Sequence, residues 1–434
     1  MSLEIHRDCK ERLVASLSQH LETVTVSNKK FLDRQSAIPI ALAEEVLPGQ
    51  GNVKDQLDKY IGELPLFDFV YEQLCKELYE GQAYEADTGA QALSEIDGYE
   101  NNQATAQRLI DDLDSLPWAY CLTLQFHNEI SEEIFPILQN FTVCDELSFV
   151  KPDDIFLDEF PLTTGDDNKD RNILGGGLLS IITDNEWKTE SIYFQFKVNG
   201  FLGYYGETST LTSVISDLKS FFGMGIALRI FKVNNQYRST PQKAKFIVHK
   251  REGENWEVHK KQELDLATSD TFHDLVLHDL NGSLDTEAKK SSWINGRLTE
   301  IQKVFSNKNR SKKLILACQW LFESYSGKNE LLAFIQTTVV LEILLGDKAS
   351  SDQMGLSVLL RNRCAYLIGS TQSQRDEILE GFAKIYDVRS KIVHGGKSRL
   401  SMNDRVLFRT LQWMCRRVIQ EEVDLLVKDL ATDA

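Results

Sequence analysis

The sequence predicts a multi-domain α+β protein, in which helical and strand-rich N-terminal regions precede an all-helical C-terminal bundle. Three observations support this fold class. The length of 434 residues is enough for two or three domains. Between about residues 116 and 290 most apolar segments are strand-like and are separated by turn residues. From Glu300 onward, apolar residues recur every three or four positions. We therefore expect a helical region at 1–115, a strand-rich α+β domain with a possible sensor role at 116–300, and a helical bundle at 301–434.

In the N-terminal region, apolar spacing predicts an amphipathic helix over residues 3–23 and a second helical stretch over 53–79. The polar segment 81–103 is expected to be an exposed connection. A further helix is expected at 103–115, because Pro117 follows it.

The middle region is expected to be mainly strands. Residues 118–126 and 146–150 are strand-like, and one helix is expected at 211–222. Two hairpins are predicted. In one, Asn199-Gly200 joins 191–198 to 201–205, and in the other, Gly253-Glu254-Asn255 joins 244–249 to 256–259.

The C-terminal region is predicted to contain five helices, at 311–326, 329–345, 354–368, 374–394 and 403–429. The second is apolar on nearly all sides, so we expect it at the centre of the bundle. Glu342 lies in this apolar helix and requires a partner, which could be Arg363 or Arg389. We favour a structural ion pair there over a catalytic role.

Charge is unevenly distributed along the chain. The formal net charge is −17, yet residues 301–434 carry 20 basic and 15 acidic side chains, whereas the first 300 residues carry 28 and 50. The C-terminal region can therefore approach a phosphate backbone more easily than the rest. An alternative explanation is simply that acidic, solvated helices dominate the first part of the chain.

Other features predict a cytoplasmic protein. No apolar run is long enough to span a membrane, and the N-terminus lacks a signal-peptide core. The seven cysteines are scattered and include no C-x-x-C pair, which favours reduced thiols over zinc ribbons. His273-Asp274 and His278-Asp279 could ligate a metal, but no third ligand has recognisable spacing, so a metal hydrolase within 116–290 is the least favoured interpretation. Asp166–Arg171 lacks the glycine and glutamate of a calcium loop.

The most informative stretch is Tyr386–Gly396. Arg389 lies near the middle of the apolar stripe of its predicted helix, where an arginine needs a partner. His394 follows five residues later, about 140° round the helix. Gly395 and Gly396 are suited to a left-handed helix end. The long arginine side chain and a loose last turn could bring Arg389 and His394 to one ligand.

This stretch resembles the R-x(4–6)-H signature of HEPN domains, and its surroundings are similar to the Apea-like HEPN group. The further matching pieces are Val340–Leu345, Arg363–Gly369, and Tyr386 three residues before Arg389. The resemblance covers roughly residues 305–434. The position after the arginine differs, because many catalytic members carry Asn, Asp or His there and this chain carries Ser390.

The resemblance implies a helical bundle that forms homodimers and cleaves RNA without a metal or another cofactor, commonly in antiviral (abortive infection) defence. Arg389 and His394 would be catalytic: the arginine would hold the phosphate and the histidine would move protons during attack by the ribose 2′-hydroxyl. Glu342, Arg363, Ser390 and Tyr386 would support them. Lys391 and Lys397 could bind substrate, although solvated surface lysines are the simpler interpretation.

A second interpretation is a non-catalytic HEPN module that dimerises or binds a nucleotide or a partner. Ser390 and the acidic first 300 residues favour it. In either case no membrane partner is expected, and the N-terminal region is the expected place for a trigger such as a phage component or a nucleotide.

Overall fold

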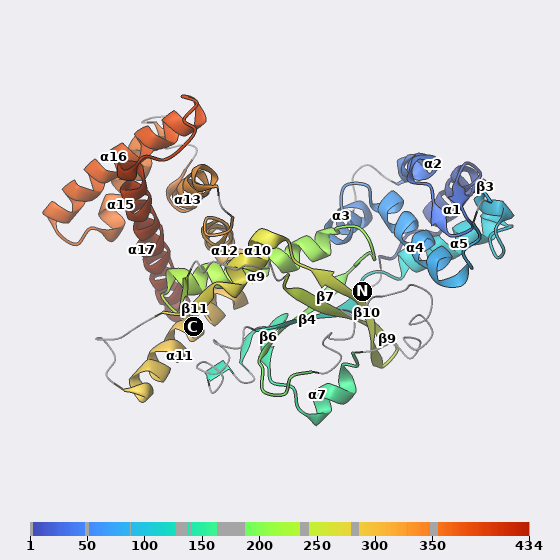
Figure 1. The fold of residues 1–434 in the computed structure, drawn as a ribbon, viewed down its shortest axis with the longest axis horizontal. Helices are drawn as coiled ribbons and strands as arrows, with labels where there is room; N and C mark the ends of the chain where they lie inside the picture. Colours follow the sequence, from blue (N-terminus) through green and yellow to red (C-terminus); the bar gives the residue numbers. More distant parts are fainter. Residues whose placement is uncertain are drawn as a thin grey trace. The chain divides into compact units, whose positions relative to one another are not determined.

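The computed structural model describes residues 3–47, 52–86, 88–126, 137–138, 141–162, 187–234, 243–278, 286–327, 329–347 and 355–433. Within them the protein has a mixed α+β fold with an all-helical C-terminal region (Figure 1). The segment Asp166–Arg171 lies outside the described residues.

The chain folds into two compact units. The first contains residues 1–121, 197–214 and 248–260, and the second contains 122–196, 215–247 and 261–434. Each unit is thus assembled from separate stretches, whereas the segments predicted from sequence follow one another along the chain. The division of the chain into domains at 1–115, 116–300 and 301–434 therefore remains a prediction.

The first unit is built mainly from helices α1 (Arg7–Leu21), α3 (Asn52–Tyr60), α4 (Pro65–Gly81) and α5 (Asn102–Asp114). Short helices α2 (Arg34–Ala37) and η1 (Ile38–Val46) pack with them around one apolar core. The predictions for the first and last of the four main helices are confirmed. The stretch 53–79 is not one helix but two, because Gly62 takes a positive φ of 145° and Pro65 then starts a new helix.

The polar segment 81–103 is not a simple exposed connection. It contains strand β3 (Ala90–Ala92), which pairs with β1 (Thr25–Ser27) in a three-stranded sheet completed by β2 (Phe31–Leu32). A short 3-10 helix, η2 (Leu93–Glu95), follows, and Leu93 and Ile96 are buried. Only a few apolar residues of this segment are buried, so its mainly polar composition did not predict that it packs on the core.

A six-stranded sheet has the order β10-β9-β4-β7-β6-β5. Its strands are β4 (Trp118–Gln125), β5 (Thr142–Cys144), β6 (Leu147–Val150), β7 (Tyr193–Gly200), β9 (Lys245–Glu252) and β10 (Asn255–Glu263). β6 pairs antiparallel with both β5 and β7, with Phe149 opposite Phe194. A two-stranded sheet joins β8 (Phe231–Val233) to β11 (Leu275–Leu277). The predicted strands 118–126 and 146–150 and the turn at Gly253–Asn255 are confirmed.

The predicted hairpin at Asn199-Gly200 is wrong. Both residues lie inside β7, and residues 201–206 form a loop instead of a returning strand. The buried carboxylate of Glu72 accepts the backbone N–H groups of Tyr204 (2.7 Å), Tyr205 (2.9 Å) and Gly206 (2.5 Å). These donors are therefore committed to a side chain on α4 rather than to a strand partner.

The second unit contains α7 (Asp154–Glu159), α9 (Ser209–Ala227, from residue 215) and α10 (Leu266–His273) in addition to the C-terminal helices. Phe149, Phe194 and Phe221 form part of its aromatic core. α9 passes so close to α12 (Lys308–Glu323) that a Cβ on Gly223 would lie 1.8 Å from the Cys318 carbonyl oxygen. Only glycine permits this approach.

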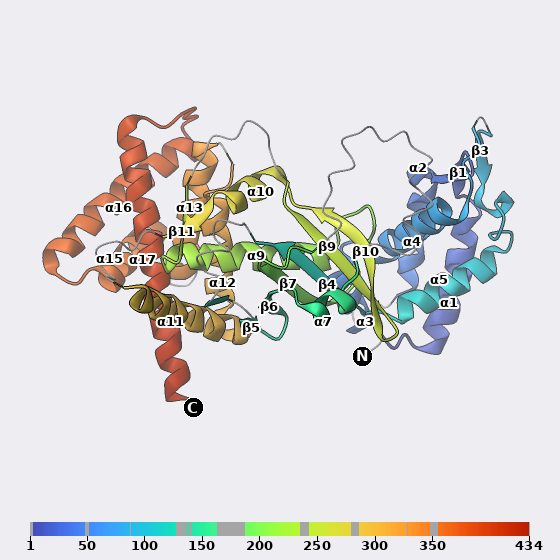
Figure 2. The same cartoon turned by 60° about the horizontal axis from the view of Figure 1, so that its bottom comes forward.

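The remaining C-terminal helices are α11 (Glu287–Ser306), α13 (Glu330–Leu345), α15 (Leu356–Ile368), α16 (Gln372–Val393) and α17 (Met402–Thr432). The five predicted helices are confirmed, and the helical region begins at residue 287 rather than 300. α17 contacts α11, α12, α13, α15 and α16, and its long run beside them is visible in Figures 1 and 2. Among the residues that the structure describes, no helix is both long and apolar enough to span a membrane.

Candidate functional site

The candidate site lies on α16, whose local sequence explains where it starts and which face it buries. The Thr371 hydroxyl caps the helix by accepting the Gln374 N–H. Ile378, Phe382 and Ile385 form its buried face, as the sequence stripe predicts. This packing presents the last two turns of α16 to the C-terminal half of α13.

Glu342, Tyr386 and Arg389 meet where α13 and α16 pack together. Arg389 Nε lies 3.2 Å from Glu342 Oε1, and the side chains are 28% and 21% exposed. The angle is too poor for a hydrogen bond at this nitrogen, so the contact is purely an ion pair. The Tyr386 hydroxyl donates a hydrogen bond of 3.0 Å to the same Glu342 oxygen. One carboxylate oxygen therefore holds both the tyrosine and the arginine.

The Tyr386 ring forms one wall around this ion pair. It stacks on Phe382 with 5.0 Å between ring centroids, and the Arg389 guanidinium lies 5.8 Å from the Tyr386 ring centre. Burial, followed by the neighbouring Glu342 carboxylate, raises the pKa of the Tyr386 hydroxyl well above its ordinary value. The hydroxyl thus stays protonated and acts as a donor to Glu342.

His394 occupies the end of α16. It is exposed, and its backbone N–H donates to the Ser390 carbonyl at 2.8 Å. The chain then turns through Gly396, which has a positive φ of 64° as the sequence predicts; Gly395 does not share this conformation. A helix end with an exposed imidazole leaves the ring accessible to a ligand.

The structure does not join Arg389 to His394. No hydrogen bond or ion pair links them among the described residues, and their environments differ, since Arg389 is partly buried and His394 is exposed. This agrees with the angular separation expected on a regular helix. A ligand that touches both side chains would have to be bound through the terminal guanidinium nitrogens of Arg389, which have no hydrogen bond to another residue in the described part of the chain.

The other predicted site residues have separate places. Arg363 does not pair with Glu342; its Nη1 donates to the Leu345 carbonyl at the end of α13 (2.8 Å), which is a structural role. Ser390 is exposed. Lys391 forms an exposed ion pair with Asp387 at 2.5 Å, one helical turn away.

Lys397 pairs with Asp404, a residue that the sequence interpretation missed. Its Nζ lies 2.7 Å from Asp404 Oδ2, and the Asp404 side chain is only 9% exposed. Asp404 and Ser401 also form the capping box that starts α17. Burial by itself would raise the pKa of Asp404, but hydrogen bonds from Lys397 and Ser401 outweigh it and lower the pKa to about 2. The spacing of Ser401 and Asp404 before an apolar run was the available signal.

The metal candidates receive no support from the described part of the chain, where no group of three or more potential ligands comes together. His273 ends α10, and Asp279 lies outside the described residues. None of the seven cysteines forms a disulfide.

Comparisons with protein-family models, with curated proteins and with solved structures find no match to this chain.

Proposed function

We propose that the C-terminal bundle is a HEPN-type, metal-independent endoribonuclease, and that the protein acts in antiviral defence. The observation that carries the proposal is the contact among Glu342, Tyr386 and Arg389. Tyr386 and Glu342 are 44 positions apart in the sequence and share a hydrogen bond. All three belong to the pieces that resemble HEPN domains, and an exposed histidine ends the same helix.

The proposed reaction is an internal transfer at phosphorus. His394 takes the proton of the ribose 2′-hydroxyl, whose oxygen attacks the adjacent phosphate. The bond to the 5′-oxygen breaks, and that oxygen takes a proton from an imidazolium, leaving a 2′,3′-cyclic phosphate and a 5′-hydroxyl. Arg389 stabilises the charge on the phosphate through its terminal N–H groups. Glu342 and Tyr386 position the arginine.

The proposed substrate is RNA, which suits the excess of basic over acidic residues from 301 onward. Lys391 can bind a phosphate at little cost in free energy, because the ion pair with Asp387 that it would give up is exposed. Lys397 is less suited to this role, because it compensates the buried carboxylate of Asp404.

The proposed assembly is a homodimer through the bundle, with two copies of the R-x4-H stretch contributing to a composite site. The matching helices carry exposed apolar side chains, among them Tyr366 on α15, which is 72% exposed, and Val393 beside His394, which is 48% exposed. The N-terminal region would carry the sensor for a phage component or a nucleotide, in a cytoplasmic protein.

A second function, a non-catalytic HEPN module that dimerises or binds a nucleotide or partner, is favoured by one specific observation. Arg389 is already paired with Glu342 and has no link to His394 in this structure. An arginine in that position serves the packing of α13 against α16 without any substrate.

One experiment separates the two functions. Purified full-length protein is incubated with mixed RNA in EDTA, and the product ends are examined. Cleavage with cyclic phosphate ends supports the ribonuclease, and intact RNA supports the non-catalytic module.

The matched variants are His394→Ala and His6→Ala. Both histidines are exposed, but His6 belongs to the first unit. We expect His394→Ala to slow cleavage by roughly 10²–10⁴-fold and to leave thermal unfolding nearly unchanged, and His6→Ala to cleave normally. A folded, dimeric His394→Ala protein with parental activity would exclude the proposed mechanism.

A further inference from the structure

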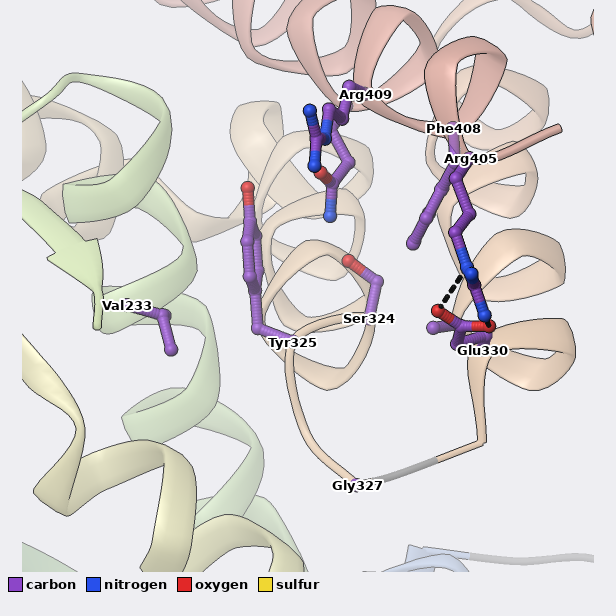
Figure 3. Close-up of a pocket in the computed structure, with 10 residues that line it drawn as sticks. Val233, Ser324, Tyr325, Gly327, Glu330, Arg405, Phe408 and Arg409 are labelled. Atoms are coloured by element: carbon purple, nitrogen blue, oxygen red, sulfur yellow. Dashed lines mark hydrogen bonds and ion pairs between the residues drawn. The ribbon is translucent and has the colours of Figure 1, made fainter. Parts of the chain in front are cut away.

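A second candidate site lies in the same bundle. A cavity of about 300 Å³ opens between the C-terminal end of α12, the N-terminal end of α13 and the first turns of α17, with Val233 of β8 at its edge. Figure 3 shows the side chains that surround it. Its volume is at the lower end of the range for small-molecule sites, so a ligand of modest size would fit.

The wall contributed by α17 is lined by a row of polar side chains. Arg405, Arg409 and Gln412 line the cavity, and Arg416 follows on the same helix face, because the spacings of four, three and four residues return to nearly the same direction. Such a row directs several donors into one space.

The charges in the cavity do not balance. Glu330 is the one acidic residue among those lining it in the described part of the chain, and Arg405 neutralises it through two guanidinium nitrogens at 2.9 Å. Arg416 donates to the Tyr325 hydroxyl at 3.3 Å, which turns that hydroxyl group toward a cation. Arg409 is exposed and forms no ion pair or hydrogen bond with another residue that the structure describes. The cavity thus offers one uncommitted guanidinium to an anion.

The cavity also has flat apolar walls. Tyr325, in the turn that follows α12, and Phe408, on α17, line the cavity and are seen on its two sides in Figure 3, with Arg409 between them at the top of the view. Phe408 is braced by Phe334, with 5.6 Å between ring centroids. Aromatic faces beside a guanidinium suit a ligand that has both a planar ring and a negative group.

We propose that this cavity binds a nucleotide unit, with its phosphate on Arg409 and its base against Tyr325 or Phe408. The unit could come from a free mononucleotide or from one residue of an RNA strand, since both present the same chemistry. The cavity is distinct from the proposed cleavage site. Ala333 at the cavity and Glu342 at the ion pair are nine positions apart on α13, or about 14 Å along the helix. The inference therefore goes beyond the proposed cleavage of RNA, and it gives the nucleotide binding of the second proposed function a specific site.

The test is calorimetric titration of the full-length protein with three probes: AMP, adenosine and inorganic phosphate. We expect AMP to bind at least about 10-fold more tightly than either of the others, because only AMP uses both the guanidinium and the rings. Arg409→Ala should weaken AMP binding by about 10–100-fold, the range for a hydrogen bond to a charged group, and leave adenosine binding unchanged.

The matched control is Arg310→Ala. It removes the same charge from α12, where Arg310 forms an exposed ion pair with Asp433, and it should bind AMP as the parent does. A fourth probe, a single-stranded DNA oligonucleotide, shows whether the bound unit is a free nucleotide or part of a strand. It lacks the 2′-hydroxyl needed for cleavage. AMP binding that depends on Arg409 supports a free nucleotide, and Arg409-dependent binding of the oligonucleotide alone supports a nucleotide within a strand.

Two results would overturn the inference: failure of both AMP and the oligonucleotide to bind at millimolar concentration, or binding that is the same in parent and Arg409→Ala. Neither result depends on RNA cleavage, because no probe can be cleaved by the proposed reaction. A loss of cleavage in His394→Ala likewise says nothing about this cavity.

Discussion

Replacement of Glu342 tests whether the contact between α13 and α16 holds the bundle together. The carboxylate serves two partners, since Arg389 pairs with it at 3.2 Å and Tyr386 donates to it at 3.0 Å. Glu342→Gln removes the charge but keeps an oxygen that can accept from Tyr386. Glu342→Ala removes both interactions. The two variants therefore separate the ion pair from the hydrogen bond.

The expected size of the effect follows from burial. A fully buried ion pair that loses one partner costs about 3–5 kcal/mol, and an exposed pair is worth at most about 1 kcal/mol. Glu342 and Arg389 are 21% and 28% exposed, which places them between these limits. We expect a loss of about 2 kcal/mol for Glu342→Gln, and about 1 kcal/mol more for Glu342→Ala because the Tyr386 hydroxyl also loses its acceptor.

The measurement is thermal unfolding of the full-length protein by calorimetry. A loss of about 2 kcal/mol corresponds to a fall in Tm of roughly 4–8 °C for a unit of this size. The matched control is Glu330→Gln on the same helix, whose ion pair with Arg405 is 47% exposed on both sides and should change Tm by about 2 °C or less.

A double-mutant cycle completes the test. Arg389→Met and Glu342→Gln together should be less destabilising than the sum of the single changes, because each single change leaves a charge without its partner. If Glu342→Gln lowers Tm no more than Glu330→Gln does, or if the two changes are additive, the ion pair does not stabilise the bundle and the reasoning is wrong.

Three further predictions concern other contacts. Asp404→Asn should destabilise the protein by about 2 kcal/mol at pH 5–7. Because the pKa of Asp404 is about 2 in the folded state and 3.8 in the unfolded state, this loss of stability should shrink as the pH falls from 4 toward 2. A loss that does not change with pH would contradict this prediction. Glu72→Ala should lower the stability of the first unit by roughly 3–5 kcal/mol in denaturant unfolding, because three backbone N–H groups lose their acceptor. A loss of less than about 1 kcal/mol would refute this prediction. Gly223→Ala should destabilise the protein by about 3 kcal/mol, because the added Cβ would collide with the Cys318 carbonyl oxygen. Gly296→Ala, whose Cβ would point into open space, should be neutral or stabilising. Equal Tm values for the two variants would disprove the close approach of α9 to α12.

The helices of the C-terminal region were determined by local sequence. Apolar residues at three- and four-residue spacing marked all five predicted helices, and Gly396 marked the end of α16. These features depend on backbone propensity and on one apolar face, so they can be deduced from neighbouring residues. The same local pattern indicated that Glu342 and Arg389 needed partners.

Which partners these residues found was decided only by tertiary structure. Both Arg363 and Arg389 were candidates for Glu342, and the packing of α16 on α13 selected Arg389, whereas Arg363 reached a carbonyl at a helix end. The wrong hairpin at Asn199-Gly200 has the same origin. Its turn signal was local, but Glu72, 133 positions from Tyr205, accepts the backbone donors that a hairpin strand would have used. A sequence pattern shows that a buried charge or donor must be satisfied, but the three-dimensional fold determines which distant group lies within reach.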